Sequence, residues 1–140
     1  MLMCTRVSKK WWTQSFRKTG KIYGHLGGST IYDKAVGTTT EFSMNLLQRT
    51  LRVQEPVHEE GENHRLAAVL VPLYRKSDEW HVLLCKRSHN LAEHPGEMAF
   101  PGGALDEGDG GYLDCALREA WEEVGINPRD VELLGSLTSV

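Results

Sequence analysis

The stretch REAWEEVGI, residues 118–126, places three glutamates on one stripe of a helix that must also pack. Residues three and four apart are neighbours on a helix surface, so Glu119, Glu122 and Glu123 point the same way and their charges meet. One interpretation is a solvated acidic face that Arg118 and water screen. The other is a site for a hard cation, because clustered carboxylate oxygens are the ligands that Mg²⁺ and Mn²⁺ prefer.

The remaining residues of the same segment predict a helix that is buried along its other side. Apolar residues recur with helical spacing, at Leu113, Ala116, Leu117, Ala120 and Val124. Gly125 and Pro128 are typical of the residues that end a helix. The segment therefore reads as an amphipathic helix with an apolar face and an acidic face.

The loop before this helix, FPGGALDEGDGG at residues 100–111, alternates glycine with acidic residues. Glycine has no Cβ, so its backbone can approach a ligand closely. The run from Gly103 to Ile126 resembles the Nudix box, which reads Gly, five residues, Glu, seven residues, Arg-Glu, an aliphatic, any residue, Glu-Glu, any residue, Gly, aliphatic. The second half matches at every signature position. In the first half Asp109 stands where Glu is usual, and the spacer before Arg118 is one residue longer.

The resemblance implies an α/β fold, a Nudix-type α/β/α sandwich with a mixed sheet, and hydrolysis of a nucleoside diphosphate derivative with bound Mg²⁺ or Mn²⁺. By resemblance, the metal ligands are Glu119, Glu122, Glu123 and the backbone carbonyl of Gly103. Glu119 is either a ligand or the acceptor of the water proton. Arg118 aligns a carboxylate through its rigid donor fork. No role is assigned to Asp109.

A narrower resemblance precedes the box, in LLCKRSHNLAEHPGEMAFPGG at residues 83–103. It is similar to the segment of coenzyme A diphosphohydrolases that leads into Phe-Pro-Gly-Gly, with Ala92 in place of the usual Arg. The substrate-binding residues that it implies are Arg87, Ser88, His94 and Gly102. The implied reaction is hydrolysis of coenzyme A or acyl-CoA to 3′,5′-ADP and 4′-phosphopantetheine. Two alternatives stay open: a Nudix hydrolase for another nucleoside diphosphate derivative such as ADP-ribose, and a non-catalytic fragment or binding module.

Composition is that of a single globular domain, with 140 residues, 40% of them hydrophobic, and a net charge of −3. The acidic balance disfavours a nucleic-acid partner and suits a small anionic nucleotide bound through a cation. There is no apolar run long enough to span a bilayer. Cys4, Cys85 and Cys115 are odd in number and form no CxxC pair, which suggests a reducing compartment, and Cys85 and Cys115 are expected to be packed thiols rather than nucleophiles.

Two regions follow from the distribution of charge and pattern. Residues 1–40 read as a basic arm, because residues 1–32 hold six Lys or Arg and no Asp or Glu. It would be a disordered arm, non-native sequence or a presequence, and it is expected to be dispensable for folding. Localisation would be cytoplasmic, or mitochondrial if the arm is a presequence. Residues 41–140 read as a partial Nudix domain with its box at about 103–126.

Within residues 41–140 the pattern predicts one further helix and four strands. Residues 41–53 read as a short amphipathic helix with Phe42, Leu46, Leu47 and Leu51 inward. The strands are predicted at 65–74, 80–87, 97–100 and 131–140. The Nudix fold normally continues beyond this last strand, so the C-terminal part is expected to be missing. The chain alone would then be marginally stable, form a homodimer through its open sheet face, or aggregate.

Overall fold

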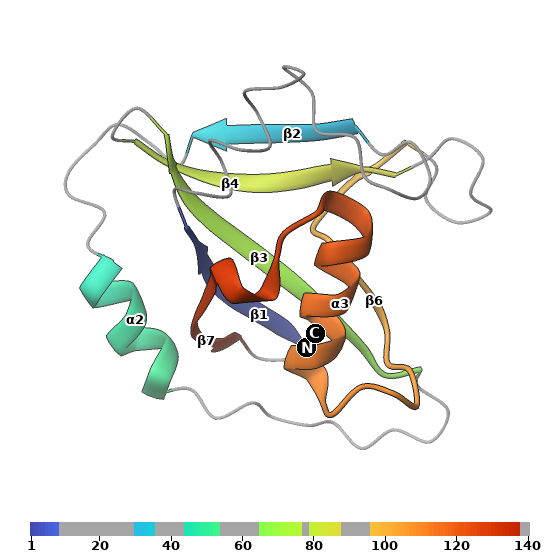
Figure 1. Ribbon diagram of the computed structural model, residues 1–140. Helices are drawn as coiled ribbons and strands as arrows, with labels where there is room; N and C mark the ends of the chain where they lie inside the picture. Colours follow the sequence, from blue (N-terminus) through green and yellow to red (C-terminus); the bar gives the residue numbers. More distant parts are fainter. Residues whose placement is uncertain (9–29, 36–43, 54–64, 77–78, 88–95, 138–140) are drawn as a thin grey trace.

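The structure, a computed structural model, is described here for part of the chain (Figure 1). The described residues are 1–8, 30–35, 44–53, 65–76, 79–87 and 96–137. The strands are β1 (Leu2–Val7), β2 (Thr30–Ala35), β3 (Ala67–Lys76), β4 (Glu79–Lys86), β5 (Met98–Ala99), β6 (Gly102–Ala104) and β7 (Val131–Leu137). The helices are α2 (Met44–Val53), α3 (Tyr112–Val124) and the 3₁₀ turn η1 (Pro128–Asp130).

The strands form one mixed sheet in the order β2-β4-β3-β1-β7. β1 runs parallel to β3, and the other neighbours along this order are antiparallel. Two short strands extend it, because β5 pairs with β4 and β6 pairs with β3. β6 is the strand that brings the glycine loop onto the sheet directly before α3.

Alternate side chains of each strand point to opposite faces of the sheet, and each face has its own apolar cluster. One face packs against α3, through residues that include Leu70, Tyr74 and Leu83. The other packs against α2, where Leu51 meets Leu73. Figure 1 shows α3 in front of β3, with α2 separate from it. The predicted α/β class, a mixed sheet between helices, is confirmed.

The four predicted strands correspond to β3, β4, β5 and β7, with ends that shift by a few residues. The prediction that the first of them is largely buried is confirmed, since Leu70 and Tyr74 have no exposed surface. β3 is covered on both faces and is bonded along both edges, so its apolar run shows little alternation. This strand forms the centre of the domain.

The N-terminal arm was expected to lie outside the fold, and for its described residues this is wrong. Leu2–Val7 is a strand between β3 and β7, and Thr30–Ala35 is a strand beside β4. In β1, Met3 and Val7 are buried on the α3 face, while Cys4 is buried on the α2 face. Because both faces are covered, the strand lacks the polar and apolar alternation that would reveal it in the sequence.

The predicted helix at residues 41–53 is observed as α2, but one of its inward residues is placed wrongly. Leu51 is buried and Leu47 packs against the same apolar cluster. Leu46 is 66% exposed. On a helix, Met44, Leu47 and Leu51 share one stripe, and Leu46 lies about 100° away from Leu47 on the solvent side. Phe42 lies outside the described residues.

The three cysteines are free and buried, which confirms the prediction of packed thiols for Cys85 and Cys115. Burial raises the pKa of Cys4, and burial with Glu123 nearby raises the pKa of Cys85 to about 12. Both thiols are therefore protonated at neutral pH. Among the described helices, none combines the length and apolar content needed to cross a membrane.

α2 approaches β7 closely at Gly135. A Cβ built on this glycine would lie 2.5 Å from the Cβ of Leu51 and 2.9 Å from its carbonyl carbon. The second of these is helix backbone, which cannot move aside as a flexible side chain can. Glycine at this position therefore allows α2 to rest on the sheet.

We predict that Gly135→Ala destabilises the domain by about 1–3 kcal/mol, because the added methyl group pushes α2 away from β7. Urea unfolding followed by tryptophan fluorescence would measure it. Gly108→Ala is the matched control, since a Cβ at Gly108 meets nothing within 4 Å. It should change the free energy of unfolding by no more than about 0.5 kcal/mol. Equal effects of the two substitutions would show that the contact with Leu51 does not limit packing.

Candidate active site

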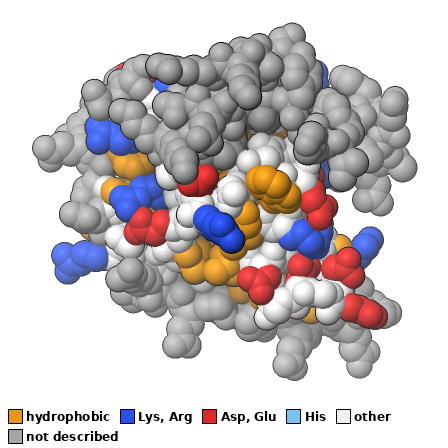
Figure 2. All heavy atoms as spheres, in the orientation of Figure 1, with side chains coloured by type: hydrophobic (Ala, Val, Ile, Leu, Met, Phe, Trp, Pro, Cys, Tyr) orange, Lys and Arg blue, Asp and Glu red, His pale blue; other side chains and the backbone are white. Residues whose placement is uncertain are grey.

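The acidic face of α3 is set by the way the helix is built. Ala116, Ala120 and Val124 are buried against the sheet, so the side that carries the glutamates faces outward. The helix ends at Gly125, which has φ of 69° and donates its N–H to the carbonyls of the preceding turn. The predicted end at Gly125 is confirmed, and Pro128 begins η1. Figure 2 shows Asp and Glu side chains gathered over α3 and the loop before it, with Lys or Arg between them.

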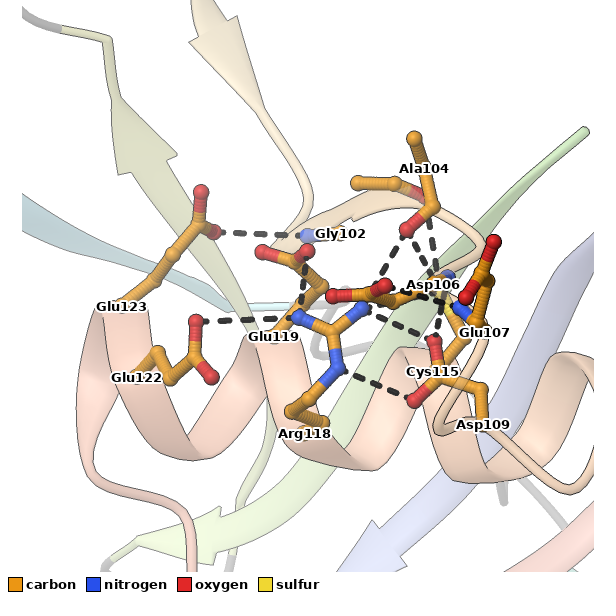
Figure 3. Close-up of polar contacts among 11 residues, drawn as sticks. Gly102, Ala104, Asp106, Glu107, Asp109, Cys115, Arg118, Glu119, Glu122 and Glu123 are labelled. Atoms are coloured by element: carbon orange, nitrogen blue, oxygen red, sulfur yellow. Dashed lines mark hydrogen bonds and ion pairs between the residues drawn. The ribbon is translucent and has the colours of Figure 1, made fainter. Parts of the chain in front are cut away.

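Arg118 is the hub of the polar contacts on this face (Figure 3). Its Nε and Nη2 donate to the two carboxylate oxygens of Asp109, each at 2.9 Å. Nη1 donates to Oε1 of Glu119 at 2.8 Å, and Nη2 also donates to the carbonyl of Ala104 at 3.2 Å. Glu122 lies 3.7 Å from Nη1. The planar guanidinium thus joins the acidic loop, β6 and α3.

The contact with Asp109 gives this residue a role that the sequence did not assign. Its side chain is 4% exposed and also accepts a hydrogen bond from the backbone N–H of Asp106. The hydrogen bonds from Arg118, and then that from Asp106, hold the pKa of Asp109 well below its usual range. The same bonds from Asp109 and Glu119 raise the pKa of Arg118 above its usual range. Asp109 is therefore an anchor for Arg118.

The departure from the usual spacing explains why this anchor was missed. The family pattern has Glu seven residues before Arg, and this chain has Asp with eight residues between. The aspartate side chain is one methylene shorter than that of glutamate, and the spacer between it and Arg118 is one residue longer. The observed two-point contact with Arg118 shows that the pair is formed despite both changes. A signal was present, since an acidic residue in the loop could be matched to the lone arginine of α3.

Gly102 and Gly103 each leave space for a neighbouring group, for different reasons. A Cβ at Gly103 would lie 2.5 Å from the carboxylate carbon of Glu119, so glycine leaves the space that this side chain occupies. A Cβ at Gly102 would lie 2.4 Å from the backbone oxygen of Ala68, so glycine lets β6 pack on β3. The N–H of Gly102 donates to Oε2 of Glu123 at 3.3 Å. The two glycines therefore place two of the three glutamates.

Glu123 shows that the face holds more negative charge than its cations balance. Burial, and to a lesser extent the charges of Glu119 and Glu122, raise its pKa to about 7. The amide of Gly102 and the charge of Arg87 act in the opposite direction. Because like charges contribute to this shift, the site would be stabilised by an added cation.

The predicted metal ligands share one face but are not gathered around one point. In the described part of the chain, no three His, Cys, Asp or Glu side chains are arranged to hold a metal ion. Glu119 is bonded to Arg118, and Glu123 is bonded to Gly102. The carbonyl of Gly103 accepts a long contact from Sγ of Cys115 at 3.5 Å. The donor types and the unbalanced charge fit a hard divalent cation, and side-chain rotation would be needed to bind one.

The predicted substrate-binding residues are only partly described. Arg87 follows β4 directly, its N–H donates to the carbonyl of Glu97 at 2.9 Å, and its charge acts on Glu123. The structure therefore brings Arg87 to the acidic face. Gly102 lies there as well, with its N–H given to Glu123. Ser88 and His94 lie outside the described residues.

Comparison with known proteins identifies the family of the chain. Residues 63–140 match the family model described as NUDIX domain, which is more than half of the chain. The chain therefore belongs to the NUDIX domain family, whose members generally use divalent ions such as Mg²⁺ or Mn²⁺.

Relatives in several bacteria are also similar. The chain is 44% identical over 96 residues to the protein named "Uncharacterized Nudix hydrolase NudL" of Escherichia coli strain SMS-3-5. The same identity and length are found with the proteins of that name from Shigella boydii serotype 18 and Escherichia fergusonii. Each match covers 69% of this chain and 50% of the relative, so the chain spans about half the length of these relatives. The matched length exceeds that of the NUDIX match, so the similarity extends upstream of residue 63.

We predict that Asp109→Asn lowers stability at neutral pH, because an amide offers Arg118 one acceptor oxygen in place of two. The folded pKa of Asp109 is lowered, so its stabilising contribution is complete above the unfolded pKa of about 3.9. It is lost as the pH falls below that value towards the folded pKa. Urea unfolding at pH 7, 5 and 3 would measure the gap between wild type and variant, which should be equal at pH 7 and 5 and smaller at pH 3.

Glu107→Gln is the matched control for this prediction, since Glu107 is exposed in the same loop. It should leave the unfolding midpoint at pH 7 unchanged. An Asp109→Asn variant as stable as the control at pH 7 would contradict the anchoring role.

Proposed function

We propose that this chain is part of a metal-dependent hydrolase that cleaves a diphosphate joined to a nucleoside. The observation that carries the proposal is the acidic face of α3, where three glutamates crowd around one arginine and two glycines. Family membership supports hydrolase chemistry, and the finer assignment rests on the chain's own residues.

The three glutamates differ in exposure and in hydrogen bonding, and we assign their roles from these differences. Glu122 has a side chain that is 42% exposed, so its carboxylate is open to a ligand from solvent. Glu119 is 19% exposed and is oriented by Arg118. Glu123 is influenced by the charges of Glu119, Glu122 and Arg87. Its carboxylate accepts a hydrogen bond from the N–H of Gly102. We assign Glu119, Glu122 and Glu123 to metal binding, with Glu119 also able to accept the proton of the attacking water.

When bound, Mg²⁺ or Mn²⁺ supplies neutralisation of the charge that grows on the bridging oxygen and lowers the pKa of the attacking water. The protein supplies the orientation of the carboxylates. Arg118 holds the carboxylate of Glu119 in one orientation, because its donors are fixed at the same time by Asp109 and Ala104. A carboxylate held this way loses little conformational entropy when it takes part in the reaction.

Arg87 is the residue that we assign to the substrate phosphates. Within the described ranges, its Nε is buried and has no hydrogen-bond partner. Its charge also reaches the acidic face, as its effect on Glu123 shows. A guanidinium with an unused donor beside a cation site can hold a phosphate oxygen while the neighbouring phosphate is cleaved.

The substrate that we propose is coenzyme A or an acyl-CoA, cleaved to 3′,5′-ADP and 4′-phosphopantetheine or its acyl derivative. The support is the run from Leu83 to Gly103, which is similar to the corresponding segment of coenzyme A diphosphohydrolases. Ala92 departs from that segment and removes one cation, so the match does not extend to every position.

We predict that Glu122→Gln lowers the rate of Mn²⁺-dependent CoA hydrolysis by on the order of 10²–10⁴, the scale of a lost ligand or acid–base group. Chromatography of 3′,5′-ADP would measure the rate, in a chain that carries the full length of a NudL-like protein. Glu107→Gln, in the exposed loop, is the matched control and should retain the wild-type rate. Equal losses at positions 107 and 122 would contradict the assignment.

The same assay tests the substrate assignment. Arg87→Ala should raise KM for CoA by about tenfold, the cost of one lost charge-assisted hydrogen bond of about 1.4 kcal/mol. Arg129→Ala, an exposed arginine of η1, should leave KM unchanged. Faster turnover of ADP-ribose than of CoA by the wild-type protein would move the substrate to the other nucleoside diphosphate derivatives.

A further inference from the structure

Cys115 is a buried thiol where α3, β6 and the acidic loop meet, and the proposed function gives it no role. It has no exposed surface and belongs to the apolar cluster beneath α3. A cysteine in such a cluster is ordinarily a small packed residue. Cys115 differs from one because the polar groups around its sulfur also surround Arg118 (Figure 3).

The sulfur of Cys115 contacts Arg118 and two carbonyl groups of β6. Sγ donates to the carbonyl oxygen of Ala104 at 3.4 Å and to that of Gly103 at 3.5 Å. It accepts from Nη2 of Arg118 at 3.8 Å. The carbonyl of Ala104 accepts from the same Nη2 at 3.2 Å. The sulfur, the carbonyl of Ala104 and Nη2 therefore all contact one another.

The same thiol reaches Asp109, the anchor of Arg118 in the acidic loop. The pKa of Asp109 is lowered first by the hydrogen bonds from Arg118, then by that from Asp106, and to a small extent by one from Cys115. Nη2 of Arg118 is held by Oδ2 of Asp109 and by the carbonyl of Ala104. Both of these acceptors are thus in contact with one buried sulfur.

The position of this sulfur is fixed by the helix. Cys115 lies in the first turn of α3, and its N–H donates to the carbonyl of Gly111 at 3.1 Å. Arg118 follows three residues later, so the two side chains are neighbours on the helix surface. The cysteine side chain is short, whereas that of arginine is long and loses more rotamer freedom when it is held. The thiol can therefore serve as a fixed point for the guanidinium.

We propose that Cys115 is a positioning residue of the candidate active site, whose thiol hydrogen bonds keep the Arg118 guanidinium in the orientation that holds Glu119. The thiol hydrogen is shared between the two carbonyls of β6 and fixes that strand against α3. The carbonyl of Ala104 then meets Nη2 while Nη1 meets Glu119. The use of Glu119 as a cation ligand rests on the proposed function, whereas the orientation of Arg118 does not.

Two substitutions of similar size separate the donor of Cys115 from its volume. Cys115→Ser keeps a donor, and Cys115→Ala removes it. Nitrogen NMR of the full chain without metal gives the rate of rotation of the Arg118 guanidinium, with the signal assigned by its loss in Arg118→Lys. Cys115→Ala should speed this rotation by about three- to tenfold, the scale of one lost hydrogen bond, and Cys115→Ser by less than about twofold.

Cys4→Ala is the control for the cavity that a truncated buried cysteine leaves, because Cys4 is buried on the α2 face. It should leave the rotation rate of Arg118 at the wild-type value. Cys115→Val also lacks a donor and is measured beside Cys115→Ala, with urea unfolding to verify that each variant is folded. Rotation at the wild-type rate in the folded variants without a donor, or equal acceleration by Ser and Ala, would overturn the proposal.

Calorimetric titration with Mn²⁺ tests the link between this orientation and the proposed function. Cys115→Ala should weaken Mn²⁺ binding by about three- to tenfold, and Cys115→Ser by less than about twofold. Equal Mn²⁺ affinity in the wild type and Cys115→Ala would overturn the positioning role. Absence of Mn²⁺ binding by the wild type would instead contradict the proposed function, and the rotation rates would still decide whether Cys115 orients Arg118.

Discussion

The guanidinium of Arg118 is the contact on which the arrangement of the acidic face depends, because it donates to three separate segments at once. It holds the loop through both oxygens of Asp109, β6 through the carbonyl of Ala104, and its own helix through Glu119. A lysine could not meet these partners, since its single ammonium group lacks the planar fork. One cation therefore fixes the loop and the orientation of a carboxylate together. The negative charge of Glu122 and Glu123 is what we propose a cation would balance.

The sheet supports α3 and its glutamates from the inner side of the helix. Glycine at positions 102 and 103 lets β6 lie against β3 and leaves room for Glu119. β1 closes the other edge of β3 and adds Met3 and Val7 to the apolar cluster beneath α3. The box helix is thus held by the loop on its outer side and by the sheet on its inner side. The chemistry that we propose at Glu119, Glu122 and Glu123 depends on both supports.

The sequence pattern predicted those helices and strands whose formation depends mainly on residues close together in the chain. The box helix, its end at Gly125 and the shared face of its glutamates follow from helical spacing and glycine geometry. β3, β4 and β7 follow from apolar runs of strand length. β1 was missed because a short strand that is buried on both faces shows no alternation, and its partners are distant in the sequence. Leu46 was placed inward because apolar character alone does not fix which stripe of α2 packs.

Asp109 was missed for a different reason. The expectation came from a fixed spacing, whereas the contact with Arg118 depends on where the loop brings the carboxylate. The loop is ordered by its own bonds, such as that from the N–H of Asp109 to the carbonyl of Asp106 at 3.0 Å. A carboxylate on such a loop can reach the arginine from more than one position in the chain. Distances between side chains, rather than the count of residues between them, decide this contact.

The central claim is that the pair formed by Arg118 and Asp109 positions the carboxylates that we propose as cation ligands. Calorimetric titration with Mn²⁺ of the wild type, Arg118→Lys, Asp109→Asn and the double variant tests it most directly. The account predicts that each single variant weakens Mn²⁺ affinity by about 10–100-fold, the usual cost of losing a residue that orients a ligand. The double variant should lose no more Mn²⁺ affinity than the single variant with the larger loss, because the two residues act as one unit. Unchanged affinity in the single variants, or losses that add in the double variant, would contradict it.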